Sequence, residues 1–424
     1  MSRLLLILPL AAAVVVSLAS AEEKKAESNI TWKKSVLDTK FRSEGVAVAD
    51  VNKDGKIDVL NGEYWYEAPD WKPHEMQPPA DHKDGLSNYS RVFACWTDDV
   101  NGDGFADLVV VAFPGEACYW MENPKGQAEE GSKPLHWKKH TIWHSACNET
   151  PIYADLLGNG KRVLLMGAQP KGKGNEGQMA YFTPGSDPTA LWELHPVSEP
   201  STPAKVENGK EVAGTRKEIP GTQRFSHGLG VGDVNGDKRN DVICTAGWWE
   251  QPEKADGKTP WVFHPAGLGE PAADMFAYDM DGDGKNDVIS TSAHKFGIWW
   301  HKQRGSEKDA NPSFQKVDLF PKLVSETHAA HFVDIDGDGR PDLVTGKRWW
   351  SHGRGEPGHD MPAMIYWFKN TKGADGITQF TPTPIDDDSG IGTQFEVADI
   401  NGDKLLDVIT SNKKGVRVIV QQRK

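Results

Sequence analysis

A nine-residue pattern that recurs along the chain constrains the fold most. The pattern D-x-[DN]-x-D-x-x-x-D occurs six times, with copies beginning at Asp50, Asp99, Asp233, Asp279, Asp334 and Asp399. A degenerate seventh copy begins at Asp155 and has Leu157 and Val163 where the other copies carry oxygen-bearing side chains. The seven starts are 46 to 78 residues apart, a spacing typical of propeller blades and not of helical solenoids.

Each repeat predicts four short strands. An apolar run precedes the pattern, a β-branched run follows it, an aromatic strand comes next, and an outer strand carries a loose W-x-x-H signature. Gly, Pro and Asn separate these runs, and helical periodicity is absent. Seven repeats of four strands predict an all-β, seven-bladed β-propeller of four-stranded blades, formed as one domain by residues 22–424.

The two ends of the sequence predict how the ring closes. The last repeat has strands at 406–411 and 416–421 but no outer strand after them, and segment 31–37 resembles the outer strand at 136–142. We therefore expect the N-terminal strand to complete the C-terminal blade. A closed ring leaves no free sheet edge, so we also expect a monomer.

The N-terminus and the composition predict where the protein works. Residues 1–21 combine Arg3, an apolar run and Ala19-Ser20-Ala21, which is the pattern of a secretory signal peptide. We expect a secreted or periplasmic protein with no membrane span after cleavage. The net charge of −13 argues against a nucleic-acid partner. The four cysteines include no C-x-x-C pair, and their pairing stays open.

The repeated pattern predicts calcium binding. Oxygen-bearing side chains at positions 1, 3, 5 and 9 suit a hard cation that takes six or more oxygen ligands. We expect about six structural calcium sites between the first and second strands of the blades. Copy by copy, the predicted ligands are Asp50, Asn52, Asp54 and Asp58; Asp99, Asn101, Asp103 and Asp107; Asp233, Asn235, Asp237 and Asp241; Asp279, Asp281, Asp283 and Asp287; Asp334, Asp336, Asp338 and Asp342; and Asp399, Asn401, Asp403 and Asp407.

Turns without metal are the alternative, because Asp, Asn and Gly also favour turns. Six copies with the same spacing favour calcium, since a bare turn does not need four oxygens in register. An EF-hand does not fit, because position 12 lacks its Glu and the flanks are predicted strands. Lys238 and Lys404 replace Gly at position 6, and a left-handed backbone there would cost about 1 kcal/mol.

The repeats resemble the FG-GAP/VCBS family of seven-bladed propellers, which includes the integrin α head. The resemblance covers most of residues 30–424 and implies the fold, but that fold hosts adhesion proteins, scaffolds and enzymes. Two segments, Ser226–Asp237 followed by Gly247–Glu250, and Thr327–Gly339, are also similar to the propeller domain of the aldos-2-ulose dehydratases. That resemblance implies a dehydratase or lyase acting on a keto-sugar with a divalent metal, and it does not extend to the cupin-type domains of those enzymes.

Polar residues that differ from blade to blade identify a candidate site. Six residues before the repeated pattern, Glu44, Glu149, His227 and His328 stand at the start of the innermost strands, at the opposite end from the acidic loops. Two His and two Glu facing one funnel could hold zinc or another divalent metal. The alternative is a funnel of hydrated polar side chains without a ligand.

Two functional hypotheses follow. In the first, the chain is a carbohydrate dehydratase or lyase. His227 and His328 act as base or metal ligands, Glu44, Glu149 and Asp274 as ligand or acid, and Arg91 and Lys347 hold the developing oxyanion. In the second, it is a non-catalytic propeller that binds a glycan or an extracellular protein at its open face.

Overall fold

The computed structural model describes residues 29–83, 85–169, 177–305, 312–374 and 376–423. The predicted signal peptide, residues 1–21, lies outside the described residues. Every regular element within the described ranges is a β-strand, which confirms the all-β prediction. These ranges also contain no helix with the length and apolar character needed to cross a membrane.

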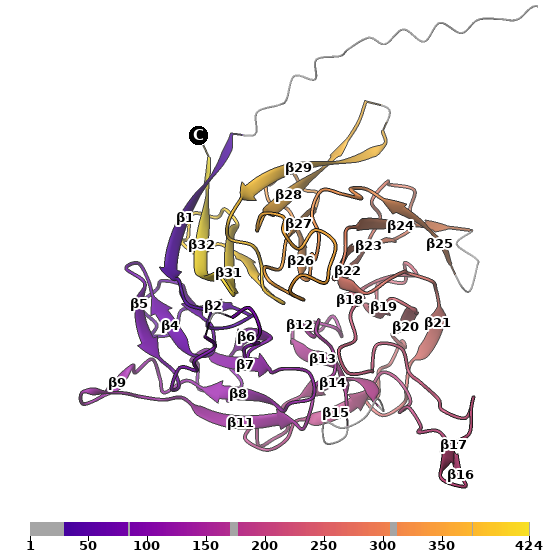
Figure 1. Ribbon diagram of the computed structural model, residues 1–424, viewed down its shortest axis with the longest axis horizontal. Helices are drawn as coiled ribbons and strands as arrows, with labels where there is room; N and C mark the ends of the chain where they lie inside the picture. The colour runs from indigo at the N-terminus through magenta and orange to yellow at the C-terminus, as the bar shows by residue number, and fades with distance from the viewer. Residues whose placement is uncertain (1–28, 84, 170–176, 306–311, 375, 424) are drawn as a thin grey trace, which may run out of the picture.

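The strands form a propeller-like arrangement of blades around a common centre (Figure 1). Five blades are separate four-stranded antiparallel sheets. Their strands are β2(Ala47–Ala49), β3(Asp58–Leu60), β4(Tyr64–Glu67) and β5(Lys72–Glu75); β6(Ala94–Asp98), β7(Asp107–Val111), β8(Cys118–Glu122) and β11(Lys138–Trp143); β12(Ile152–Ala154), β13(Val163–Ala168), β14(Gln178–Thr183) and β15(Glu193–Pro196); β26(Ala330–Val333), β27(Asp342–Gly346), β28(Ile365–Lys372) and β29(Thr378–Asp386); and β30(Glu396–Ala398), β31(Asp407–Asn412), β32(Gly415–Arg423) and β1(Ile30–Asp38).

The remaining large sheet has eight strands and joins two successive meanders. Its strands are β18(Leu229–Gly232), β19(Asp241–Cys244), β20(Gly247–Glu250) and β21(Val262–Pro265), then β22(Ala272–Tyr278), β23(Asp287–Ser292), β24(Ile298–Arg304) and β25(Ser313–Asp318). The inner strands β18 and β22 pair in parallel at Gly230 and Met275. A Cβ at Gly230 would lie 2.2 Å from the carbonyl oxygen of Met275, so this close approach requires glycine.

The N-terminal strand pairs with the C-terminal strand. Strand β1 runs antiparallel to β32, from Ile30 opposite Arg423 to Asp38 opposite Val416. It thus occupies the outer position of the sheet whose inner strands are β30 and β31, as the sequence predicts. Two small hairpins lie outside the large sheets: β9(Glu129–Glu130) with β10(Lys133–Pro134), and β16(Val206–Glu207) with β17(Lys210–Glu211).

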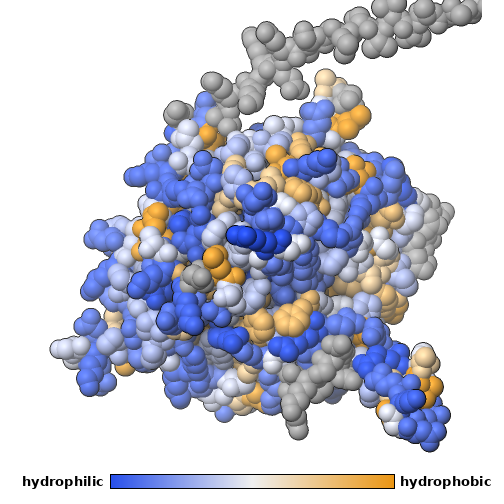
Figure 2. All heavy atoms as spheres, viewed as in Figure 1, coloured by the Kyte–Doolittle hydropathy of each residue, from blue (hydrophilic) through white to orange (hydrophobic). Residues whose placement is uncertain are grey.

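The hydrophobic core lies between neighbouring sheets. One cluster, for example, combines Leu165 and Tyr181 of one sheet with Leu229, Val242 and Trp249 of the next. This packing fixes each inner strand against its neighbours and so fixes the start of every inner strand around the centre. The face seen in Figure 2 is mostly hydrophilic, with apolar residues in small scattered groups.

Candidate functional site

The acidic loops share one hydrogen-bond pattern. In all six copies the backbone N–H of position 6 donates to the carboxylate of position 1, as from Gly55 to Asp50 (3.0 Å) and from Lys238 to Asp233 (2.8 Å). The degenerate copy has the same bond, from Gly160 to Asp155 (2.7 Å). Lys238 and Lys404 have φ angles of 72° and 69°, which confirms the predicted left-handed backbone at position 6.

The carboxylate oxygens of two loops converge closely enough for a cation. One set is Asp279, Asp281 and Asp283, and the other is Asp334, Asp336 and Asp342; within each, one oxygen per residue lies within 4.8 Å of the others. Oxygen ligands alone at this spacing suit calcium.

The Asp at position 9 has a structural role that sequence reasoning missed. Asp58 is fully buried and accepts hydrogen bonds from the backbone N–H groups of Val51 (3.0 Å) and Ala68 (2.8 Å), so it ties the loop to the end of the third strand. The same pair of bonds recurs at Asp107, Asp241, Asp342 and Asp407. Burial raises the pKa of Asp58 to about 6 and that of Asp107 to about 7.

At the opposite end of the inner strands, three predicted site residues meet. Glu149, His227 and His328 precede β12, β18 and β26, and one donor atom from each lies within 4.8 Å of the others. The two Nε2 atoms of the histidines are 3.1 Å apart. The Glu149 Oε2 atom lies 3.7 Å from Nε2 of His227 and 3.3 Å from Nε2 of His328. We call these three residues the funnel triad.

The triad distances match a metal ligand set. Ligands bound to zinc at about 2.0–2.1 Å in a tetrahedron are about 3.3 Å from one another. The three observed separations lie around that value. Imidazole nitrogen and carboxylate oxygen also suit zinc, manganese, iron and cobalt better than calcium. The donor set and its spacing therefore fit a transition metal.

The surroundings of the triad favour the protonation states in which its side chains can bind a metal. Burial, together with the positive charge of Arg348, lowers the pKa of His227 to about 4 and that of His328 well below its ordinary value. Burial by itself would raise the pKa of Glu149, but the hydrogen bond with His328 and the positive charge of Arg348 favour the carboxylate, and the net pKa is lowered. Two neutral imidazoles and one carboxylate are the forms that bind metals.

Arg348 connects the triad to the fourth predicted residue of the ring. Its guanidinium is fully buried, 3.3 Å from Glu149 Oε2 through Nη1 and 3.5 Å from Glu44 Oε2 through Nε. Glu44 is also fully buried. Glu44 thus lies beside the triad through Arg348, a residue that was not among the predicted site residues.

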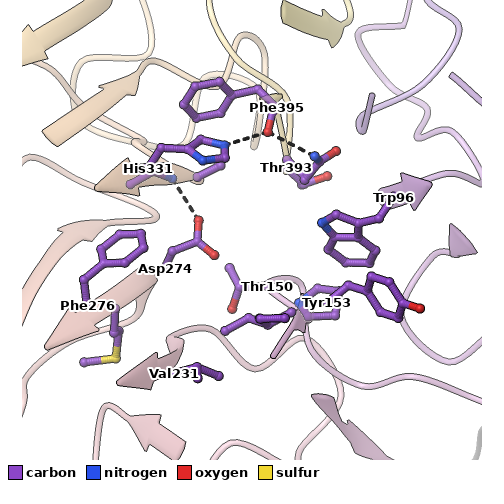
Figure 3. Close-up of a pocket in the computed structure, with 16 residues that line it drawn as sticks. Trp96, Thr150, Tyr153, Val231, Asp274, Phe276, His331, Thr393 and Phe395 are labelled. Atoms are coloured by element: carbon purple, nitrogen blue, oxygen red, sulfur yellow. Dashed lines mark hydrogen bonds between the residues drawn. The ribbon is translucent and has the colours of Figure 1, made fainter. Parts of the chain in front are cut away.

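Asp274 lines a cavity that is separate from the funnel triad. This cavity of about 200 Å³ is lined by Asp274 and His331, and also by Thr150 and Ala329, the residues that follow Glu149 and His328 (Figure 3). The Asp274 carboxylate accepts a hydrogen bond from the Ala330 backbone N–H (2.8 Å), and burial raises the pKa of Asp274 to about 7.

Lys347 and Arg91, the side chains predicted to hold the oxyanion, make other contacts in the structure. Lys347 is buried in an ion pair with Glu326, and its Nζ also lies 3.1 Å from Ser325 Oγ. Arg91 has a largely exposed side chain and pairs with Glu116 at 3.1 Å. Neither contact joins these cations to the funnel triad.

Three further metal-binding side chains lie beside the triad and were not among the predicted site residues. They are His294, just after β23, and His352 and Glu356 in the insertion 347–363, with donor atoms within 4.8 Å of one another. Neither histidine stands six residues before the repeated pattern, and the path of the insertion 347–363 does not follow from the repeat.

The W-x-x-H histidines are structural. Each ring stacks on an aromatic side chain of the third strand: His74 on Trp65, His140 on Trp120, His195 on Tyr181 and His264 on Trp248. The four cysteines are buried and form no disulfide.

Comparisons with known proteins find one matching family model. The FG-GAP-like repeat model matches residues 279–345. A search of the curated proteins finds no match. Among solved structures, an Agrocybe aegerita lectin described as recognising non-reducing terminal N-acetylglucosamine is 14% identical, with a TM-score of 0.42 over 93% of this chain and 86% of the lectin.

Two other solved structures are similarly distant. The Photorhabdus luminescens Tc holotoxin pore is 15% identical, with a TM-score of 0.35 over 88% of this chain and 16% of that one. A V. cholerae biofilm matrix protein is 15% identical, with a TM-score of 0.31 over 74% of this chain and 45% of that one. The matched repeat and the arrangement of the sheets together support an FG-GAP β-propeller.

Proposed function

We propose that this chain is a secreted, calcium-binding propeller that binds a divalent transition metal at Glu149, His227 and His328 and acts there on a carbohydrate. The triad carries this proposal, because its separations of 3.1, 3.3 and 3.7 Å match those of ligands around one ion. A divalent cation bound there would polarise a carbonyl or hydroxyl oxygen of the substrate.

The proposed reaction is the dehydration of a keto-sugar, the class implied by the resemblance to the dehydratase propeller. The C–H bond next to the carbonyl and the C–O bond on the following carbon break, a C=C bond forms, and the proton and hydroxide leave as water. Asp274 suits the proton transfer, because a carboxyl group with a pKa of about 7 can accept and donate protons near neutral pH. Arg348 orients Glu149 by pairing with it.

We also propose seven blades in a closed ring. The eight-stranded sheet consists of two four-stranded meanders, which count as two blades beside the five separate ones. The pairing of β1 with β32 supports closure. Calcium in the six acidic loops and export through the N-terminal segment belong to the same proposal and are supported by the sequence patterns.

A metal analysis tests the centre. The mature protein would be purified in excess calcium, and each element would be counted per chain by plasma mass spectrometry. We expect about six calcium ions and at least one transition-metal ion. The His227→Ala/His328→Ala variant should lose transition metal and keep its calcium and its fold. The matched control, His74→Ala/His140→Ala, removes two stacked outer histidines and should lose neither metal.

Activity is then followed on keto-sugars through the ultraviolet absorbance of the conjugated product. The wild type should produce it, and the His227→Ala/His328→Ala variant should lose at least about 100-fold in rate, since even residues that only support metal ligands are worth 10- to 100-fold. Calcium alone in the wild type, with no turnover, would contradict the metal centre.

In that case the non-catalytic function takes precedence, and one surface favours it. Phe225, two residues before His227, is 41% exposed. The Arg224 guanidinium lies 4.8 Å from the Phe225 ring centroid and 5.9 Å from that of Phe113. Such a patch of aromatic rings and a cation can bind a sugar face or a peptide. Ligand binding would then weaken in Phe225→Ala and survive in His227→Ala.

A further inference from the structure

Beside the funnel triad lies a second set of side chains suited to a metal. The donor atoms of His294, His352 and Glu356 are all within 4.8 Å of one another. His294 Nδ1 is 3.4 Å from Glu356 Oε1. This second set has the same composition as the triad, two imidazoles and one carboxylate, although its residues come from the end of β23 and from the insertion 347–363.

The two sets are in direct contact. The ring centroids of His227 and His294 are 4.5 Å apart, and those of His294 and His352 are also 4.5 Å apart. The ring centroid of His328 lies 6.3 Å from those of both His294 and His352. Four imidazoles therefore form one continuous cluster, flanked by Glu149 on one side and Glu356 on the other.

Two imidazole nitrogens of this cluster lack hydrogen-bond partners. The Nδ1 atoms of His328 and His352 are buried and have no hydrogen-bond partner among the described residues. Buried polar atoms are nearly always paired, because an unpaired one costs about 1–3 kcal/mol.

We propose that His294, His352 and Glu356 bind a second divalent cation next to the first, so that the funnel holds a two-metal centre. The inference rests on the proposed function, because the triad supplies the first site. Two neighbouring cations can hold two neighbouring oxygen atoms of one ligand. The substrate class is therefore a sugar with adjacent carbonyl and hydroxyl oxygens, or with a vicinal diol.

The test is a manganese titration of the full mature protein, with calcium in excess to fill the oxygen-only loops. Bound Mn²⁺ is counted by plasma mass spectrometry, and coupling between ions is read from the electron paramagnetic resonance spectrum. We expect two Mn²⁺ per wild-type chain with a spin-coupled signal. His352→Ala/Glu356→Gln should bind one, with the spectrum of an isolated ion. Arg354→Ala, an exposed change in the same insertion, should still bind two.

The outcomes separate the two proposals. One Mn²⁺ per chain that survives in His352→Ala/Glu356→Gln and disappears in His227→Ala/His328→Ala overturns the second site and leaves the first intact. One Mn²⁺ that disappears in both variants means that both sets bind a single ion, which also overturns the two-metal centre. No Mn²⁺ in the wild type overturns the second site together with the proposed function, and the contact between His294 and Glu356 would then only hold the insertion in place.

Discussion

The inner strands of this propeller have two ends that follow different rules. Where the strands end, the acidic loops repeat one hydrogen bond, from position 6 to the carboxylate of position 1, and even the degenerate copy at Asp155 keeps it. Where the strands begin, the corresponding residues differ from blade to blade: Glu44, Phe93, Glu149, His227, Ala273, His328 and Thr393.

This difference separates structure from function within a single sequence. A contact that serves the blades themselves recurs from blade to blade, as the stacked outer histidines do in four of them. A buried charge or imidazole that stands in only a few blades costs free energy without serving the repeat. Glu149, His227 and His328 are such residues, and they meet at one point.

The largest effect on stability is expected at the variable end, from Arg348→Met. Removing this guanidinium leaves the buried carboxylates of Glu44 and Glu149 without their cation. Breaking a buried ion pair on one side costs about 3–5 kcal/mol. Urea unfolding should show a loss of that size, and a second change, Glu44→Gln, should restore part of it. Equal stability of Arg348→Met and wild type would mean that the ion pairs of Arg348 with Glu44 and Glu149 make no net contribution to the free energy of unfolding.

The repeat predicted the triad because inner strands of one propeller start at equivalent positions. Counting six residues back from each acidic loop was enough to select Glu149, His227 and His328. The second set of ligands could not be found in this way, because His352 and Glu356 lie in an insertion whose path depends on tertiary contacts.

The direction of single side chains was also beyond the sequence. Lys347 and Arg348 are adjacent, yet Lys347 pairs with Glu326 and Arg348 with Glu44 and Glu149. The repeat pattern does not predict which way the side chains point after the end of β27. Likewise, the parallel pairing of β18 with β22 depends on Gly230, which lets the two strands approach each other.

A smaller effect should separate an intact loop from the degenerate one. Asp281→Asn/Asp283→Asn removes two carboxylates from a convergent set and should lower the calcium count by one. At a calcium concentration 100-fold above the dissociation constant, the loss is about 2.7 kcal/mol. Asp155→Asn, in the degenerate loop, should leave the calcium count unchanged. Thermal unfolding with and without a chelator measures the loss of stability, and plasma mass spectrometry counts the calcium. An unchanged calcium count in the double variant would exclude this loop as a calcium site.

The smallest effect concerns Glu396, which stands in the short inner strand β30 between the two ends. Burial raises its pKa to about 8, against about 4.3 in the unfolded chain. A raised folded-state pKa means that the contribution of Glu396 to stability is complete below pH 4 and is lost as the pH rises through 8. Glu396→Gln removes this loss. In excess calcium, its melting temperature should therefore rise relative to wild type between pH 5 and pH 9, by on the order of 2–4 °C. Glu253→Gln, an exposed change, should give a curve parallel to wild type. If Glu396→Gln also runs parallel, Glu396 is ionised in the folded protein, and the middle of the funnel is open to water.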